Sequence, residues 1–346
     1  MQVWCDRCKA LWQGHRALLP LMLISLVQLF GGFILLIWGA DRLVAGASAS
    51  ARNFGVSPLI IGLTIVGFGT SAPELVVSAV AAYQGKPGLA VGNAIGSNIA
   101  NIGLILGLTA MIYPLRVSSQ TLKREYPLLM LIMVACFIMA ANLDFSRLEG
   151  VILLIGLATL ILWMIRLGTR KEPDDPLAQE FADEIPSDMP TRTAMLWLGV
   201  GLVILPLSSY FLVSGAVSIA RMLQVSETVI GLTIVAMGTS LPELAASLTS
   251  ALRKEDDLAI GNVIGSNMFN ILGVLGLAAV IHPVSFERSI LVQDMPVMFL
   301  FSVLLFFMAY GIRGPGRIRR SSGLLLLLLF LAYMGLVWQN AETVVI

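Results

Sequence analysis

Apolar residues gather in ten stretches of this chain, each long enough to cross a lipid bilayer as a helix. A transmembrane helix needs about 20 mostly apolar residues. The ten stretches are residues 20–40, 58–83, 88–113, 126–143, 148–167, 194–220, 227–252, 258–282, 290–312 and 322–339. Their lengths predict an all-α membrane protein with ten transmembrane helices.

Composition and charge agree with this prediction. Hydrophobic residues make up 57% and charged residues 12% of the 346 positions, whereas charged residues are about 25% of a typical soluble domain. A net charge of +1 at pH 7 indicates no particular partner. The expected surroundings are a lipid bilayer, and neither a nucleic acid nor an obligatory protein partner is expected.

The chain contains an internal duplication. Residues 57–114 and 226–283 align without a gap at an offset of 169, and 31 of these 58 positions are identical, which is far beyond chance for apolar helices. Each half holds five predicted spans, and five is odd, so the second copy enters the membrane from the opposite side. This predicts two inverted-topology five-helix repeats, the architecture by which secondary transporters open one site alternately to each side.

Lys and Arg are spread unevenly over the loops between the spans. The loops after spans one, three, five, seven and nine hold about 15 of the 22 basic residues, and basic loops are retained in the cytoplasm. We therefore expect both termini outside and the central loop inside. Asp41, followed by Arg42 at the end of the first span, is interpreted as an interfacial or gating charge.

Two segments lie outside the repeats. Residues 1–19 are expected to be a leader before the first five-helix repeat at 20–169; they contain Cys5 and Cys8, but a structural zinc takes four ligands and only His15 is near. Residues 170–192 are rich in Pro, Asp and Glu and predict an acidic cytoplasmic linker before the second repeat at 193–346. A regulatory cation sensor is the alternative for this linker, although it lacks EF-hand spacing.

The motif GTSxPE lies in the middle of a span in each half. Thr70 and Ser71 lie on the same helical face as Glu74, and Pro73 lacks an N–H and frees a carbonyl about one turn earlier. Irregular backbone at membrane depth survives only where it is buried in protein or lines a wet cavity. The second half repeats the pattern with Thr239, Ser240, Pro242 and Glu243.

The next span of each half carries a polar stripe. Residues four apart share one helical face, which places Asn93, Ser97 and Asn101 together in the first half and Asn262, Ser266 and Asn270 together in the second. Small residues beside the stripe let helices approach closely. Any one of these side chains alone could serve only as an interhelical hydrogen bond, but the two glutamates, duplicated in register with proline, are hard to explain in that way.

A carboxylate at the centre of a membrane helix costs roughly 2.5–3.5 kcal/mol on insertion scales. The nearest bases in the sequence, Lys86 and Arg253, lie at the far ends of their spans, so a transported cation or a proton is the expected counter-charge. Carboxylate, amide, hydroxyl and carbonyl oxygens suit Ca²⁺ or Na⁺, whereas zinc or copper favours His and Cys, which the motifs lack. An intramembrane protease is disfavoured, since the spans contain no HExxH motif and no pair of aspartates, and a channel is disfavoured by the inverted repeats.

The paired GTSxPE and GNxIGSNxxN segments resemble the alpha repeats of the calcium/cation antiporter superfamily, and within it the bacterial sodium/calcium exchanger-like inner-membrane proteins. The resemblance covers essentially the whole chain beyond the leader. It implies the sodium/calcium exchanger fold, no cofactor and no enzymatic activity. It also implies that the cation sites are built by Glu74, Glu243, Thr70, Ser71, Thr239, Ser240, Ser97, Ser266, Asn101 and Asn270 and by the backbone carbonyls of Gly67 and Ala236.

One position departs from some sodium-coupled relatives, which carry an aspartate where this chain has Asn101 or Asn270. Two acids then remain to balance the cargo. The function implied by the resemblance is exchange of Ca²⁺ for Na⁺ across the bacterial cytoplasmic membrane by alternating access, and Ca²⁺/H⁺ or K⁺-dependent exchange is the alternative.

Overall fold

The computed structural model describes residues 2–56, 61, 64–65, 67–117, 120–169, 189–285, 287–309 and 316–343, and their backbone is mostly helical. The side chains of residues 2–19, 67, 120–124, 167–169 and 342–343 lie outside the described set, as does most of the predicted linker. The CxxC side chains of the leader and the cation-sensor alternative for the linker therefore fall outside this set.

The described residues of the first half form six α-helices longer than one turn and several short elements. Its helices are α1 Gln2–Asn53, α3 Gly67–Gly69, α4 Ala72–Tyr83, α5 Pro87–Ala100, α6 Gly107–Ile112, α7 Gln120–Met139 and α8 Arg147–Thr169. The π-helical segment η2 Asn101–Leu106 joins α5 to α6, and the 3₁₀ turn η3 Ala140–Asn142 follows α7. The strands are β1 Leu115–Val117 and β2 Asp144–Phe145.

The second half repeats this order. Its helices are α10 Thr191–Leu223, α11 Glu227–Ile230, α12 Ala236–Thr239, α13 Leu241–Leu252, α14 Asp256–Phe269, α15 Gly276–Ile281, α16 Met295–Ala309 and α17 Arg320–Thr343. The π-helical segments are η4 Gly231–Val235, η5 Asn270–Leu275 and η6 Ile290–Asp294, and the strands are β3 Val284–Ser285 and β4 Gly316–Ile318. The π-helical segments η2 and η5 begin at Asn101 and Asn270, which are equivalent in the two halves.

The all-α membrane fold is confirmed, but the count of ten spans is not. Eight helices of the described part are long and apolar enough to cross a membrane, and a ninth span results if the pair Glu227–Thr239 and Leu241–Leu252, bent by 41°, is counted as one. The predicted span at 58–83 corresponds to α3 and α4, and several residues before α3 lie outside the described set.

The first helix of each half is longer than its predicted span. The expected spans 20–40 and 194–220 are parts of α1 and α10, and the expected leader continues into α1 as helix. The charges at Asp41 and Arg42 do not end α1, because the Arg42 guanidinium lies 4.7 Å from the ring centre of Trp197 on α10 and contacts the carboxylate of Asp41 at 3.7 Å. A cation that packs on an aromatic ring can stay in a helix at the edge of the apolar region.

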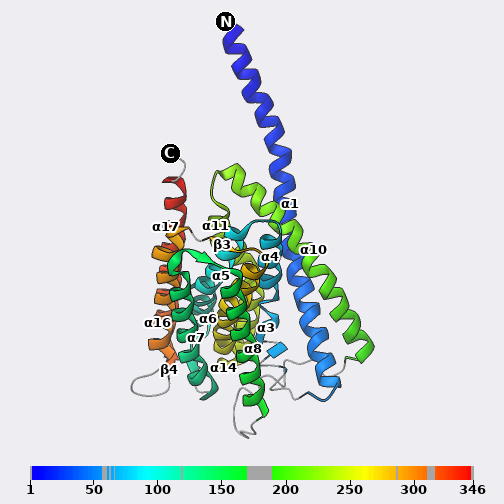
Figure 1. Cartoon of the computed structure of the whole chain (residues 1–346), viewed down its shortest axis with the longest axis vertical. Helices are drawn as coiled ribbons and strands as arrows, with labels where there is room; N and C mark the ends of the chain where they lie inside the picture. The colour runs from blue at the N-terminus through cyan, green and yellow to red at the C-terminus, as the bar shows by residue number, and fades with distance from the viewer. Residues whose placement is uncertain are drawn as a thin grey trace.

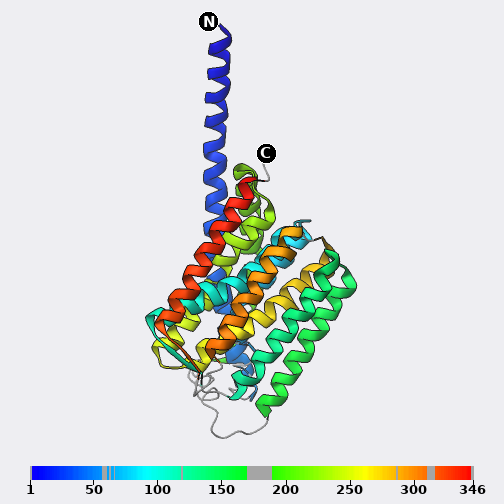
Figure 2. The ribbon, with the colours of Figure 1, turned by 90° about the vertical axis from the view of Figure 1, so that its left-hand side faces the viewer.

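Helices α1 and α10 lie side by side along much of their length (Figure 1). Glycines allow this approach: a Cβ at Gly46 would lie 2.5 Å from the backbone nitrogen of Leu198, and one at Gly215 would lie 2.7 Å from the carbonyl oxygen of Ser25. Figure 2 shows α7 and α8 (green) at one edge of the bundle, on the far side from α17 (red). The long first helices therefore form one layer against a compact bundle.

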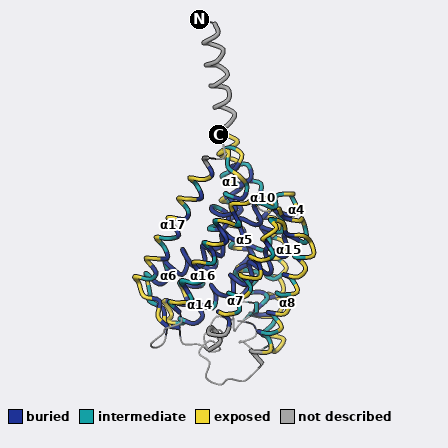
Figure 3. Tube along the Cα trace, turned by 60° about the vertical axis from the view of Figure 1, so that its left-hand side comes forward, coloured by how far each residue is buried: buried dark blue, intermediate teal, exposed yellow. Residues whose placement is uncertain are grey.

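Each half closes over the other. A Cβ at Gly323 of α17 would lie 2.5 Å from the carbonyl oxygen of Gly107 on α6, and one at Gly150 of α8 would lie 2.8 Å from that of Gly276 on α15. Gly107 and Gly276 are equivalent positions. Figure 3 shows the result, with α5 and α14 dark blue at the centre; the spans Pro87–Ile112 and Asp256–Ile281 are 78% and 83% buried, and the others are 22–39% buried.

The connecting segments separate onto two faces of the bundle. On the first, here called the linker face, β1 pairs with β4, and the Asn53 amide donates to the carbonyl oxygen of Met189. On the second, here called the opposite face, β2 pairs with β3, and Lys86 pairs with Glu227. The loops that the basic residues assign to one side of the membrane therefore do meet one another. Which face is cytoplasmic remains a prediction from the basic loops.

Candidate cation-binding site

The two GTSxPE motifs each break a helix at the centre of the bundle. Helix α4 starts after Ser71, with Pro73 in its first turn, and α13 starts after Ser240, with Pro242 in its first turn. Proline favours the first turn of a helix, where its missing N–H leaves nothing unsatisfied. The motif thus starts a new helix at mid-membrane, with a carboxylate in the first turn, where the helix dipole favours negative charge.

The glutamates are fully buried and held by the other half of the chain. The Ser71 hydroxyl donates to Glu243 Oε1 at 2.9 Å, and the Ser240 hydroxyl donates to Glu74 Oε1 at 3.1 Å. Both glutamates have 0% exposure. Each carboxylate therefore lies against the motif of the opposite repeat, as the inverted topology predicts, and the two acids share one compact site.

The threonines of the two motifs also form hydrogen bonds between the halves. Thr70 donates to Asn262 Oδ1 at 3.1 Å, and Thr239 donates to Asn93 Oδ1 at 3.0 Å. The predicted polar stripe is therefore pressed against the broken helices.

The amides of the same asparagines hold the glutamate helices. Asn93 Nδ2 donates to the Ser78 hydroxyl at 3.0 Å and to the backbone oxygen of Glu74 at 3.3 Å. Asn262 Nδ2 makes the same two bonds, to Ser247 and to the backbone of Glu243. Neither serine was among the predicted site residues, although their identity at equivalent positions of the repeat was a signal that could have found them.

Several oxygen atoms in this site lack a hydrogen-bond partner among the described residues. These are Glu74 Oε2, Glu243 Oε2, Ser97 Oγ, Asn101 Oδ1 and Asn270 Oδ1. Buried polar atoms are almost always hydrogen-bonded, and each exception calls for an explanation. All five are oxygen atoms, the type of ligand that Ca²⁺ and Na⁺ prefer. Their unused lone pairs fit a site that receives such a cation.

No Lys or Arg in the described part of the chain neutralises the two acids. Neither Glu74 nor Glu243 forms an ion pair with a Lys or Arg of the described part of the chain, and Lys86, the base expected nearest to Glu74, pairs with Glu227 at the surface. An unpaired buried charge is strongly unfavourable. The described residues therefore supply no counter-charge to this site.

The remaining predicted residues occupy three kinds of position. Ser266 donates weakly to Glu243 Oε1 at 3.4 Å, and the Ala236 carbonyl accepts from the Thr239 hydroxyl at 3.3 Å. Asn101 is buried beside the stripe of the other half, because its Nδ2 donates to Asn267 Oδ1 at 3.0 Å. Asn267 was not predicted as a site residue, although it too is repeated, as Asn98.

Helix α1 contacts both motifs through their glycines. A Cβ at Gly238 would lie 2.1 Å from the ring of Phe33, and a Cβ at Gly69 would lie 2.4 Å from Val44 Cγ2. Only glycine leaves room for these two side chains. One face of α1 therefore covers the broken helices of both repeats.

This arrangement of two inverted halves, broken helices and a shared acidic site at mid-membrane defines a secondary transporter. The profile of the family "Sodium/calcium exchanger protein" matches residues 24–166 and 193–339. The chain belongs to this family of cation antiporters, and the resemblance seen in the sequence is confirmed.

Relatives extend along nearly the whole chain. The putative antiporter CaxA of Alkalimonas amylolytica is 47% identical, covering 92% of this chain and 100% of that protein. The inner membrane protein YrbG of Escherichia coli (strain K12) is 40% identical, covering 92% of this chain and 98% of that protein. A solved structure of the sodium-calcium exchanger NCX_Mj, soaked with Na⁺ and Sr²⁺, matches with a TM-score of 0.64 at 35% identity, covering 91% of this chain and 98% of that one.

Proposed function

We propose that this protein exchanges Ca²⁺ for Na⁺ across a bacterial cytoplasmic membrane by alternating access, exporting Ca²⁺ as Na⁺ enters. The observation that carries the proposal is the pair Glu74 and Glu243, fully buried, bonded across the two halves and without a base among the residues that the structure describes. An acidic site without a resident counter-charge takes its balancing charge from the cargo. Two carboxylates balance one Ca²⁺ or two monovalent cations, so the two kinds of cargo exclude each other.

The proposed ligands of the cations are the twelve predicted residues. The carboxylates of Glu74 and Glu243 bind Ca²⁺, and the hydroxyl, amide and carbonyl oxygens around them complete the cation sites. The ten residues that supply these other oxygens are Thr70, Ser71, Thr239, Ser240, Ser97, Ser266, Asn101, Asn270, Gly67 and Ala236. The unpartnered oxygens of Ser97, Asn101 and Asn270 support this assignment.

The names of relatives support the proposed cargo and the proposed membrane. The sodium/calcium exchanger MaX1 of Methanosarcina acetivorans is 31% identical, covering 90% of this chain and 97% of that protein, and YrbG is named an inner membrane protein. With the basic loops inside, the linker face is cytoplasmic and the opposite face is outside.

Calcium/proton exchange is the alternative, because each glutamate has one oxygen without a partner that can take a proton as readily as a metal. The test is Ca²⁺ flux into proteoliposomes of the purified full chain. One arm imposes a Na⁺ gradient with the proton gradient collapsed, a second imposes a proton gradient without Na⁺, and a third adds K⁺. Flux in the first arm alone supports the proposal, flux in the second alone supports proton exchange, and no flux in any arm overturns both.

A further inference from the structure

The ion pair between Lys86 and Glu227 joins the two halves at the opposite face. Lys86 Nζ donates to Glu227 Oε1 at 2.5 Å, and the two side chains are 25% and 27% exposed. Lys86 is the residue before α5, and Glu227 is the first residue of α11. The pair therefore fastens the starts of two helices that lie 141 residues apart in the chain.

Below the ion pair, α5 lies in backbone contact with α11 and η4. A Cβ at Gly92 would lie 2.4 Å from the carbonyl oxygen of Thr228, and one at Gly96 would lie 2.6 Å from that of Leu232. The same Cβ at Gly96 would lie 2.8 Å from the Ala236 Cβ. The seam between these helices therefore runs from the ion pair at the surface down to Ala236 in the cation site.

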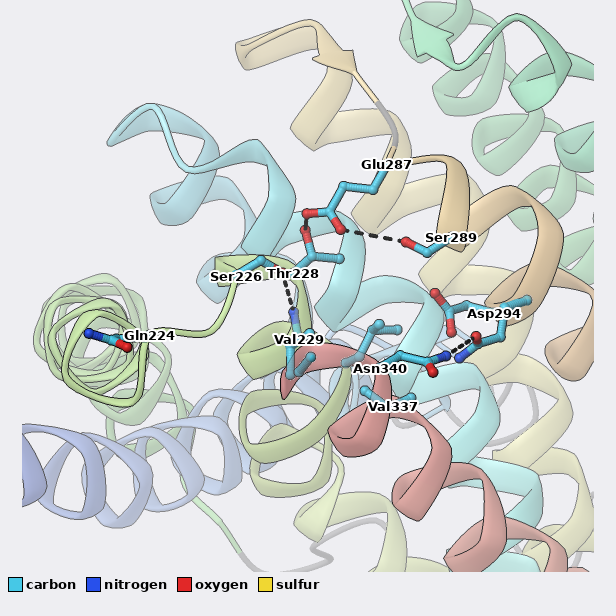
Figure 4. Close-up of a pocket in the computed structure, with 12 residues that line it drawn as sticks. Gln224, Ser226, Thr228, Val229, Glu287, Ser289, Asp294, Val337 and Asn340 are labelled. Atoms are coloured by element: carbon cyan, nitrogen blue, oxygen red, sulfur yellow. Dashed lines mark hydrogen bonds between the residues drawn. The ribbon is translucent and has the colours of Figure 1, made fainter. Parts of the chain in front are cut away.

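A cavity lies beside this seam on the opposite face. Its volume is about 210 Å³, and it is lined by the exposed Glu287 and by the buried Leu232 and Asp294. Figure 4 shows Glu287 and Asp294 among the lining residues. Leu232 lies four residues, about one helical turn, before Ala236. The segment α11–η4 is thus the barrier between the cavity and the site, and Thr228 at its start donates to Glu287 Oε1 at 2.9 Å.

The equivalent positions of the other repeat cannot form this ion pair. The offset of 169 places Lys86 on Glu255 and Glu227 on Pro58. An acid and a proline have no attraction of this kind, whatever their placement. The equivalent positions at the linker face therefore do not repeat this ion pair, and it breaks the symmetry of the two repeats.

We propose that Lys86 and Glu227 form a latch that holds α11 against α5 and so keeps the cation site closed toward the opposite face. The latch rests on the proposed exchange function, and both residues are positioning residues, since neither contacts a cation. Opening toward the opposite face requires this pair to separate, and opening toward the linker face does not. The apparent affinity for Ca²⁺ offered at the opposite face is lowered by the fraction of time the latch is closed.

The test compares the wild type with Lys86→Gln, Glu227→Gln and the exchanged pair Lys86→Glu with Glu227→Lys. The half-saturating Ca²⁺ concentration is measured separately at each face, in oriented proteoliposomes. Each single variant is expected to lower it about two- to fivefold at the opposite face, the range of a partly exposed ion pair, without lowering it at the linker face. The exchanged pair restores the wild-type value, and Asp144→Asn, an exposed carboxylate on the same face, changes nothing.

A second measurement does not depend on transport. Leu232→Cys, in a chain whose Cys5, Cys8 and Cys136 are replaced by serine, reports opening by its rate of maleimide labelling from the opposite face. Lys86→Gln is expected to raise this rate about two- to fivefold, and the exchanged pair is expected to reverse the increase. Unchanged labelling, or equal affinity changes at both faces, overturns the latch; a wild type without any Ca²⁺ flux overturns the proposed function, while labelling still decides the latch.

Discussion

The environments of Glu74 and Glu243 can be compared bond by bond, because one sequence pattern builds both. The serine bonds across the halves measure 2.9 Å to Glu243 and 3.1 Å to Glu74. Where the two helix breaks face each other, the repeats agree closely. The positions of the two acids are therefore set by contacts that only the assembled pair of repeats can make.

The halves differ among the groups that line the site around the acids. The Ser266 hydroxyl reaches Glu243 at 3.4 Å, whereas the Ser97 hydroxyl has no partner in the described part of the chain. Asn101 donates to Asn267, whereas neither amide atom of Asn270 is bonded to a described residue. A symmetric scaffold thus presents an asymmetric set of oxygens, which is what a protein needs if it is to receive two kinds of cation in one place.

The first prediction tests the symmetric part. Glu74→Gln and Glu243→Gln are each expected to reduce Ca²⁺ exchange at least about tenfold, and to a similar extent, because either change removes half of the charge from a site of low dielectric. Uptake of radiolabelled Ca²⁺ by reconstituted protein, scanned across Na⁺, K⁺ and pH, measures the loss. Asp144→Asn is the control, and a glutamine variant that exchanges normally would refute the site.

The second prediction removes the bonds that cross between halves. Ser71→Ala and Ser240→Ala are each expected to raise the half-saturating Ca²⁺ concentration about tenfold, since a hydrogen bond to a charged group contributes about 1.5–3 kcal/mol. The effects should match because the two bonds match. Ser214→Ala, which removes a hydroxyl that bonds to its own helix at Tyr210, should leave the affinity unchanged, and a loss of the same size there would point to general destabilisation.

The third prediction tests the difference between Asn101 and Asn270. Asn101→Leu removes the amide that donates to Asn267 and is expected to lower the free energy of unfolding by about 1–3 kcal/mol. Asn270→Leu removes no bond to a described residue, and any loss of stability there should be clearly smaller. Thermal unfolding in detergent with a calcium chelator present measures both, and equal losses would mean that the Asn101–Asn267 bond does not distinguish the halves.

The smallest effects are expected from the two stripe serines, and their signs differ. Ser266→Ala loses a long bond to Glu243 and should lower the free energy of unfolding by about 1 kcal/mol or less. Ser97→Ala removes a buried hydroxyl without a partner, so without cations it should stabilise the fold slightly while weakening Ca²⁺ binding about two- to threefold. The same unfolding assay, with and without Ca²⁺, separates these signs; stabilisation by Ca²⁺ that Ser97→Ala leaves unchanged would exclude this hydroxyl as a ligand.

The sequence predicted the centre of the molecule well, because there the duplication and the chemistry coincide. A carboxylate beside proline, repeated in register, indicates a helix break at mid-membrane, and the odd number of spans per half predicts that the breaks face each other. Both features follow from local rules. Proline interrupts a helix, and each apolar stretch of about 20 residues indicates one crossing of the membrane.

Features that depend on contacts between distant helices could not be predicted in this way. The first span was expected to end near Asp41. The sequence could not show that the adjacent Arg42 packs on Trp197, which lies 155 positions further along the chain (197 − 42 = 155). The prediction of the polar stripe assumed an α-helical period throughout, whereas the chain changes to π-helix at Asn101 and Asn270. A π-helical turn is common at functional sites, but no single-residue preference marks its position.

The crossed serine bonds bear on how such a molecule arose. Ser71 serves the carboxylate of the second copy, and Ser240 serves that of the first, so one copy alone would contain a glutamate and a serine that never meet. A single repeat could build this site only as an antiparallel pair of two copies, one inserted in each direction. Joining the two copies in one chain fixes this antiparallel pairing and lets the halves differ, as they do at the ion pair Lys86–Glu227, which the equivalent residues of the other repeat do not form.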